Sequence, residues 1–179
     1  MSRKADNCLP FFLCLALLSV VYSGRAVAFQ GTGETEVYFS PDGGATAAIV
    51  REIDRASYKI LVQAYSFTSK PIASALLRAQ KRNVEVTVIM DGRELKEKYN
   101  AVRFFKNSRV QIFLDDKHAI AHNKVIIVDN KTLITGSFNF TKAAEFENAE
   151  NLLVFKDNPP LVERYEKNFY EHLSHSRRY

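Results

Sequence analysis

The most constraining feature of this sequence is a stretch near its middle, HNKVIIVDNKTLITGSFN, which begins at His122. Four consecutive β-branched residues, Val125 to Val128, predict a buried strand rather than a helix. Side chains two positions apart on a strand point to the same side of the sheet, so His122 and Lys124 share one side. The stretch therefore places an imidazole, which can act as a nucleophile, beside a fixed positive charge.

The second half of the stretch repeats this spacing with a hydroxyl and an amide. A short turn after Asp129 leads into a second predicted strand, Thr132 to Thr135, which runs into Gly136. Ser137 and Asn139 follow, again two positions apart. A glycine lets the backbone come close to a bound group, because it has no side chain in the way. Imidazole, ammonium, hydroxyl and amide groups together suit a phosphate, which takes positive charge and hydrogen-bond donors.

Six positions of this stretch form the complete pattern H-x-K-x4-D-x6-G-S-x-N. The pattern resembles the signature of the phospholipase D superfamily, and a short chain with one copy of it is most similar to the small bacterial endonuclease branch. The matching residues are His122, Lys124, Asp129, Gly136, Ser137 and Asn139. The resemblance implies a metal-independent phosphodiesterase that forms a phosphohistidine on His122, without a metal or another cofactor.

Two acidic residues complete the predicted catalytic set. Glu150 matches the superfamily's glutamate beyond the signature, and the resemblance implies that it orients the imidazole of His122. A neutral histidine nucleophile needs one ring nitrogen free and the other held by an acceptor. Asp129 is seven residues from His122, so on a regular strand it faces the opposite side. We expect Asp129 to support the site by packing and hydrogen bonding rather than by touching phosphate.

The two-step reaction also needs an acid for the leaving alkoxide. Lys124, Ser137 and Asn139 are expected to hold the phosphate oxygens. The signature contains one histidine, His122, which is the nucleophile, so the acid must come from elsewhere. Single-copy members of the superfamily are similar to halves of its two-copy enzymes, which implies a homodimer that brings His122 and its counterpart together. One imidazole would attack while the other, protonated, donates a proton, and this predicts a bell-shaped pH profile.

The other histidines offer two alternatives. His118 lies four residues before His122 and is the rival acid within the chain, although its polar loop favours an exposed surface histidine. The same spacing suits zinc ligands on a helix, with Asp115 and Asp116 nearby, but the strand pattern that follows argues against a helix there. The two remaining histidines lie in a polar tail and are expected at the surface: His172 and His175.

The first 28 residues are predicted to be a cleavable signal peptide. Arg3 and Lys4 form a positive region, Leu9 to Tyr22 an apolar core, and Ala26-Val27-Ala28 a cleavage site. We therefore expect a periplasmic or secreted protein, with a retained membrane anchor as the alternative. Residues 29–179 would then form a single domain.

Cleavage would leave a domain without thiols and with a mild positive charge. Both cysteines, Cys8 and Cys14, precede the cleavage site, which excludes a disulfide framework and a cysteine nucleophile in the mature protein. Cleavage would also remove three basic residues and one acidic residue, so the formal net charge would fall from +5 to +3. This charge is compatible with a polyanionic partner without demonstrating one.

Predicted strands and helices alternate along the mature domain. This order predicts an α/β fold in which a mixed β-sheet is sandwiched between helices on both faces. The hairpin-like spacing of the two signature strands makes the sheet mixed rather than purely parallel. The other expected strands are 36–39, 59–64, 84–90, 110–114 and 151–155, and the expected helices are 45–56, 71–81, 95–105 and one after Pro160.

These features predict one leading function and two alternatives. The leading function is an endonuclease that hydrolyses DNA, and RNA as well, with little sequence preference, because phosphate contacts carry no sequence information. The first alternative is a hydrolase of phospholipids such as cardiolipin, for which Phe138, Phe140 and Phe146 would form an apolar rim unless they pack in the core. The second is a non-catalytic nucleic-acid-binding protein, against which the intact signature argues.

Overall fold

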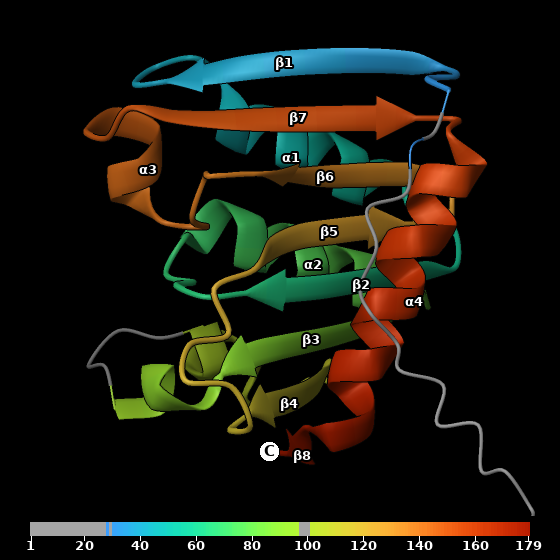
Figure 1. The fold of residues 1–179 in the computed structure, drawn as a ribbon. Coiled ribbons are helices and arrows are strands. Elements are labelled where there is room, and N and C mark those ends of the chain that lie inside the picture. Colours follow the sequence, from blue (N-terminus) through green and yellow to red (C-terminus); the bar gives the residue numbers. More distant parts are fainter. Residues whose placement is uncertain (1–27, 29, 97–100) are drawn as a thin grey trace, which may run out of the picture.

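The computed structural model describes residues 28, 30–96 and 101–179 (Figure 1). The predicted signal peptide lies, except for Ala28, outside the described residues. Within the described ranges, no helix combines the length and the apolar character needed to cross a bilayer.

Eight strands form one sheet in the order β1-β7-β6-β5-β2-β3-β4-β8. β2, β3 and β4 run parallel to one another, and every other neighbouring pair is antiparallel. The strands are β1 (Glu34–Ser40), β2 (Lys59–Ala64), β3 (Glu85–Asp91), β4 (Gln111–Asp115), β5 (Lys124–Val128), β6 (Thr132–Gly136), β7 (Glu150–Lys156) and β8 (Arg177–Arg178). The sheet is therefore mixed, as predicted, and its antiparallel and parallel parts meet where β5 pairs with β2.

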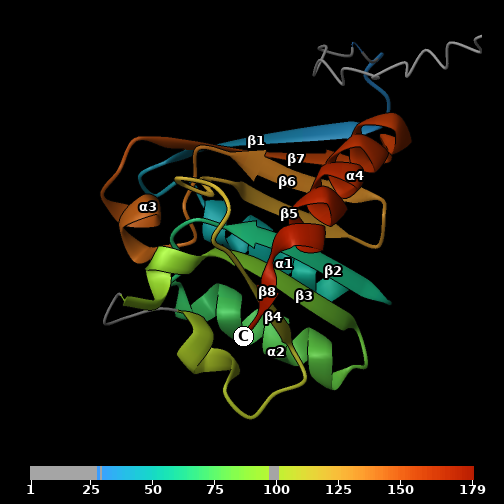
Figure 2. The same cartoon turned by 60° about the horizontal axis from the view of Figure 1, so that its bottom comes forward.

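Helices cover both faces of this sheet (Figures 1 and 2). α1 (Ala45–Arg55) and α2 (Lys70–Lys81) pack on one face, and α4 (Pro159–His175) crosses the other. In β2, Ile60 and Val62 belong to the larger core with α1 and α2, whereas Leu61 belongs to the smaller core with α4. A strand buried on both faces is apolar at nearly every position, as β2 is apart from Lys59 and Gln63. The predicted α/β sandwich is confirmed.

The helix starts follow local signals in the sequence. Ser69 caps α2 by accepting a hydrogen bond from the amide of Ile72 (3.5 Å), and Pro71 occupies the first turn. Asn158 caps α4 through the amide of Leu161 (3.4 Å), again with proline in the first turn. Another short helix, α3 (Lys142–Phe146), is capped by the Thr141 hydroxyl, which accepts from the amide of Ala144 (3.1 Å).

The structure differs from the prediction at 95–105. Instead of one α-helix, two 3₁₀ segments occupy this region, η1 (Gly92–Lys96) and η2 (Ala101–Phe105), with 97–100 outside the described residues. Val102 and Phe105 are both buried in the core with α2. Their spacing of three residues fits a 3₁₀ turn, which repeats every three residues, and explains why the apolar pattern was mistaken for an α-helix.

Candidate active site

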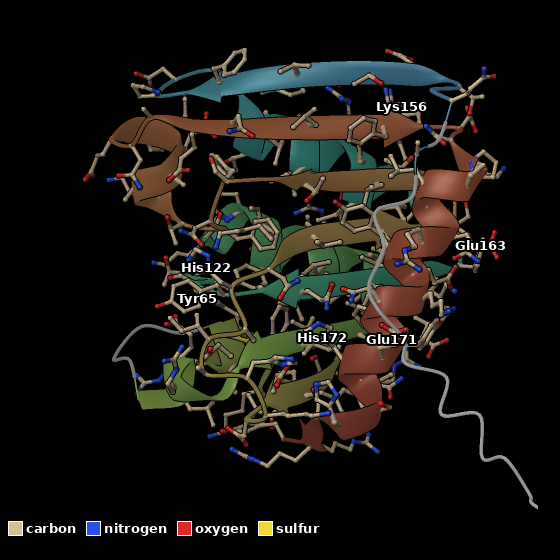
Figure 3. The ribbon with its side chains drawn as sticks, viewed as in Figure 1. Tyr65, His122, Lys156, Glu163, Glu171 and His172 are labelled. Carbon is tan, nitrogen blue, oxygen red and sulfur yellow. The ribbon has the colours of Figure 1, made fainter. Side chains whose placement is uncertain are left out.

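His122 lies just before β5, where Figure 3 labels it beside Tyr65. Lys124 is the first residue of β5 and pairs with Ala64, at the edge of the sheet where β2 ends. The His122 residue is exposed, whereas Lys124 is only 7% exposed. The Lys124 ammonium donates a hydrogen bond to the backbone oxygen of His122 (3.0 Å). Burial lowers the pKa of Lys124 below its ordinary value, although the negative charge of Glu150 opposes this shift. A reactive imidazole and a poorly solvated cation therefore share one site.

Tyr65, which follows β2, is a third member of this site that the sequence analysis missed. Its ring centre lies 4.5 Å from that of the His122 imidazole, and the Lys124 ammonium lies 5.1 Å from the Tyr65 ring centre. The amide of Tyr65 donates to the backbone oxygen of Asn123 (2.9 Å) and thereby extends the pairing of β2 with β5. An aromatic residue directly after a predicted buried strand, 59–64, was the available signal in the sequence.

Gly136 ends β6 and allows a close approach between β6 and β7. Its φ is 150°, and an added Cβ would lie 2.3 Å from the backbone oxygen of Asn151. That oxygen accepts hydrogen bonds from the amides of Ser137 (3.1 Å) and Phe138 (3.2 Å). The close approach of β7 therefore requires glycine at this position. The sequence analysis had explained Gly136 by the approach of a bound group and not by this packing.

Ser137 and Glu150 contact each other across β6 and β7. The Ser137 hydroxyl donates to Glu150 Oε2 (2.6 Å), and the Asn148 side-chain amide donates to Glu150 Oε1 (3.2 Å). Among the hydrogen bonds of the described residues, none joins Glu150 to the His122 ring, so the predicted orienting contact is not present. The reason is the strand order: β6 lies between β5 and β7, so Glu150 meets Ser137 first. Glu150 still acts on Lys124 through its charge.

Asn139 retains an unused hydrogen-bonding side chain. Its Oδ1 is buried and has no hydrogen-bond partner within the described part of the chain. The backbone beside it is fixed, because the oxygen of Phe140 accepts from the amides of Thr68 and Ser69 (2.9 and 2.8 Å). Buried polar atoms are normally paired, so the orphaned amide oxygen of Asn139 is suited to a hydrogen-bond donor that arrives with the substrate.

Asp129 lies beyond the other end of β5 and has a structural role. Its carboxylate accepts hydrogen bonds from three consecutive amides, those of Ser57 (2.6 Å), Tyr58 and Lys59 (both 2.9 Å). Burial opposes its ionisation, but these backbone bonds outweigh that effect and lower its pKa. Five residues of strand, roughly 16 Å, separate it from Lys124. Asp129 fixes the turn that leads into β2, in keeping with the supporting role expected for it.

The loop between β4 and β5 carries the chain to His122 and is held by two buried aspartates. It crosses the ends of β3 and β2 (Figure 1). Asp91, at the end of β3, accepts from the amide of Ala121 (2.8 Å), and Asp115, at the end of β4, accepts from the amide of Lys117 (3.0 Å). Both carboxylates follow directly after buried strands, a sequence signal that could have identified them as loop anchors.

The remaining histidines do not join the active site. His118, His172 and His175 gather around the buried carboxylate of Asp115, at distances of 2.9, 2.8 and 3.3 Å from Oδ2. The prediction of surface positions for His172 and His175 is wrong, since their side chains are only 14% and 21% exposed. The His118–His122 metal alternative is also not assembled: among the described residues, the donor cluster that contains His118 leaves out both His122 and Asp116.

Comparison with protein families and relatives agrees with this geometry. Residues 49–173 match the family described as "Cardiolipin synthase, PLD-like domain". A Rickettsia conorii protein named "Phospholipase D" is 41% identical over 155 residues, which are 87% of this chain and 77% of that protein. A Rickettsia felis protein of the same name is 42% identical over 131 residues, 73% of this chain. This chain spans 65% of the length of the Rickettsia felis protein.

A solved structure with a similar fold extends the comparison. The crystal structure of Nuc from Salmonella typhimurium, described as a phospholipase D family member, superposes with a TM-score of 0.78 at 38% sequence identity. The superposition covers 82% of this chain and 97% of Nuc. The fold described above therefore corresponds to nearly the whole of that smaller protein.

Proposed function

This chain belongs to the phospholipase D superfamily of phosphodiesterases, and from that premise we propose that it is a metal-independent endonuclease that hydrolyses DNA, and RNA as well. The observation that carries the proposal is that the exposed His122 lies beside the buried Lys124, whose ammonium donates to the backbone oxygen of His122. A nucleophile must be reached by its substrate, and a cation is most effective where water is scarce.

In the proposed first step, a ring nitrogen of His122 attacks phosphorus and the bond to the leaving oxygen breaks. The leaving oxygen takes a proton from the acid, and a phosphohistidine remains. In the second step, water attacks phosphorus, gives its proton to the same acid, now a base, and the bond to His122 breaks. Lys124 is placed to hold a non-bridging oxygen, because its ammonium bonds to a backbone oxygen and to no side chain of the site. Asn139 would donate to a second oxygen through its side-chain NH2 group.

Ser137 and Glu150 support this centre from the next strand pair. The proton of the Ser137 hydroxyl is engaged by Glu150, so Ser137 contacts phosphate only by giving up that bond. We therefore assign Ser137 chiefly to positioning Glu150, whose charge balances that of Lys124. Glu150 can orient the imidazole of His122 only after a side-chain movement that substrate binding would have to cause.

The general acid is proposed to be His122 of a second subunit. The chain contains four histidines, and the three other than His122 lie around Asp115. His118, the rival acid, is thus committed to Asp115 rather than directed at the site. A homodimer with two imidazoles facing one phosphate supplies one nucleophile and one acid. The rate of phosphodiester hydrolysis would then rise and fall again as pH increases.

Nucleic acid is favoured over phospholipid by the rim of the site. Phe138 and Phe140 are 0% and 1% exposed, so they pack in the core and cannot contact a membrane. Arg93 is exposed near Tyr65 at the edge of the site. Its guanidinium is held by Asp91 through two hydrogen bonds (both 2.9 Å), and its exposed side could meet a neighbouring phosphate of a polyanion. The likeness to Nuc adds support. Phospholipid remains the alternative, because relatives carry the name phospholipase D and Phe146 is 54% exposed on α3.

Turnover of plasmid DNA and of cardiolipin vesicles, both in EDTA, tests the substrate. We expect cleavage of DNA to exceed that of lipid. We also expect Arg93→Gln to slow DNA turnover and to reduce the slope of log K for DNA binding against log salt concentration by about one unit. Arg78→Gln is the matched control, since Arg78 lies near the end of α2 and pairs with Asp54 on α1. Faster turnover of cardiolipin, unaffected by Arg93→Gln, would establish the lipid alternative.

Sedimentation of the active protein tests the shared site. We expect activity to sediment with a dimer, and an active protein that stays monomeric at assay concentration contradicts the second His122 as the acid. A non-catalytic binding protein would retain DNA binding in the wild type without producing any cleavage.

We further propose that the mature protein is periplasmic or secreted. The leader pattern that ends at Ala28 supports this location. Mass spectrometry of the protein from a secreting host is expected to give a chain that begins at residue 29, whereas an intact N-terminus in the membrane fraction would support the anchored alternative.

A further inference from the structure

Asp115, His118, His172 and His175 converge from three separate elements of the fold. Asp115 ends β4, His118 lies in the following loop, and the other two lie one turn apart at the end of α4, where Figure 3 labels His172 well away from His122. One possible ligand atom from each of the four side chains lies within 4.8 Å of the other three. Together these residues, here called the Asp115 cluster, form a compact set of three nitrogens and one carboxylate.

Hydrogen bonding alone accounts poorly for the Asp115 cluster. Three imidazole nitrogens lie 2.8–3.3 Å from one oxygen, Asp115 Oδ2. The other oxygen, Oδ1, already accepts from the amides of Lys117 (3.0 Å) and His118 (3.3 Å). A carboxylate offers about four lone-pair directions in total, so five donors exceed its capacity. A cation among these groups removes the surplus, because each imidazole then uses a lone pair instead of a proton.

We propose that the Asp115 cluster binds a divalent transition metal, with zinc as the best fit. Zinc is commonly held by four ligands of this type in a tetrahedron, with Zn–N distances of about 2.0–2.1 Å and hence ligand-to-ligand distances of about 3.3 Å. The contact of His175 with Asp115 Oδ2 has that spacing (3.3 Å), and those of His172 and His118 (2.8 and 2.9 Å) must lengthen by a few tenths of an ångström. The separations within the cluster, which reach up to 4.8 Å, must shorten as the side chains close on the ion. Calcium and magnesium are disfavoured, because they prefer oxygen ligands.

Burial in the cluster suits an ion that enters from one side. The Asp115 side chain is fully buried, and His172 and His175 are 14% and 21% exposed, whereas His118 is 43% exposed. An ion can therefore enter from the side of the cluster on which the His118 loop lies. The two α4 ligands have the spacing H-x-x-H, which places them on the same side of the helix.

Such a site would be structural rather than catalytic. Four protein ligands close the coordination of zinc and leave no position for substrate. The ion would fasten the end of α4 to the loop that leads to His122, four residues after His118. The chemistry proposed at His122 does not pass through this ion. Chelation would thus lower thermal stability while turnover continues at temperatures well below unfolding.

Zinc binding to the full-length chain tests this proposal without reference to activity. The protein is prepared without a histidine tag, in a Cys8→Ser/Cys14→Ser background that removes both thiols of the chain, and is stripped of metal. Calorimetry is expected to show one zinc per chain, and the melting temperature is expected to rise with zinc concentration. Cobalt in place of zinc is expected to give the intense visible absorption of a tetrahedral site.

The variants locate the ion. His172→Gln/His175→Gln removes two ligands and is expected to weaken zinc binding by about 100-fold or more, and His118→Gln, on the exposed side, by about tenfold or more. His122→Gln is the matched control and is expected to bind zinc like the parent. The proposal is overturned if the parent binds no zinc, or if His118→Gln and His122→Gln bind it equally well. His118→Gln and the cobalt spectrum of the parent keep the test decisive if the double variant does not fold.

Discussion

The four histidines of this protein occupy two regions with opposite character. At the start of β5, the exposed ring of His122 has aromatic contact with Tyr65 and makes no hydrogen bond to another side chain of the described structure. At the end of β4, three imidazoles all direct a ring nitrogen at Asp115. Hydrogen bonds from His172, His118 and His175 outweigh the burial of that carboxylate and hold its pKa well below its usual range.

The difference shows that the partner of an imidazole decides its use. A ring whose nitrogens are unbonded is available to attack phosphorus, whereas a ring committed to a carboxylate contributes to the fold. The two regions should therefore separate in experiment: changes at the start of β5 should affect turnover, and changes around Asp115 should affect stability.

The largest effect is expected for His122→Ala. Removal of the nucleophile should lower kcat by about 10³-fold or more, while the free energy of unfolding should change by no more than about 0.5 kcal/mol, because the side chain is exposed. Single-turnover cleavage and urea unfolding of the same preparation measure the two quantities. A variant that keeps more than a tenth of the parental rate would falsify the assignment of His122.

Lys124→Met is expected to lower kcat by about 10²–10³-fold through the loss of charge at the phosphate oxygens. Because burial penalises the ammonium, the same variant should be as stable as the parent or more so. Lys124→Arg is the control that keeps the charge in another shape. Stability that falls together with activity would show that Lys124 serves the fold first.

The lowered pKa of Lys124 also has a consequence for pH. In the folded state the ammonium loses its proton below the ordinary lysine value of about 10.4, so turnover should decline at a lower pH than it would with an unperturbed lysine. The unfolded chain binds this proton more tightly than the folded chain, so the contribution of Lys124 to stability rises as pH increases through that window. In Lys124→Met, both the decline in turnover due to Lys124 and the rise in stability should disappear.

Asp115→Asn is expected to lower the free energy of unfolding by about 2–3 kcal/mol in EDTA, because a buried charged acceptor loses its bonds to three imidazoles and two amides. Turnover per folded molecule should fall far less than in His122→Ala. Asp116→Asn, next in sequence but paired with Arg177 at the surface, is the matched control. Equal stability of the two variants would remove the contrast between the two regions.

The smallest effect is expected for Tyr65→Leu, about a tenfold loss of kcat, because the ring positions His122 without being proposed to react. Tyr65→Phe keeps the ring and should stay close to the parent. If Tyr65→Phe is as slow as Tyr65→Leu, the hydroxyl rather than the ring matters, and Tyr65 becomes a candidate proton donor.

The sequence predicted what depends on neighbours along the chain. The β-branched run after Lys124 identified β5, and the alternation of elements identified the mixed sheet with helices on both faces. It could not show contacts that depend on strand order, such as the bond of Glu150 to Ser137 across β6, and the orienting role of Glu150 toward His122 stays a prediction. The prediction that His172 and His175 lie at the surface failed, because nothing local in the sequence shows that the end of α4 lies against the end of β4.

The main chain on either side of His122 is fixed from both directions: Asp91 binds the amide of Ala121, and Tyr65 binds the oxygen of Asn123. A side chain that gains and loses a bond to phosphorus in every cycle changes its charge and its available nitrogens twice. A partner on the attacking nitrogen would have to be released and recovered each time, whereas a partner on the other nitrogen could remain. Positioning through the peptide groups leaves the aim of the imidazole independent of its covalent state, so the residue can return to its starting geometry after each turnover.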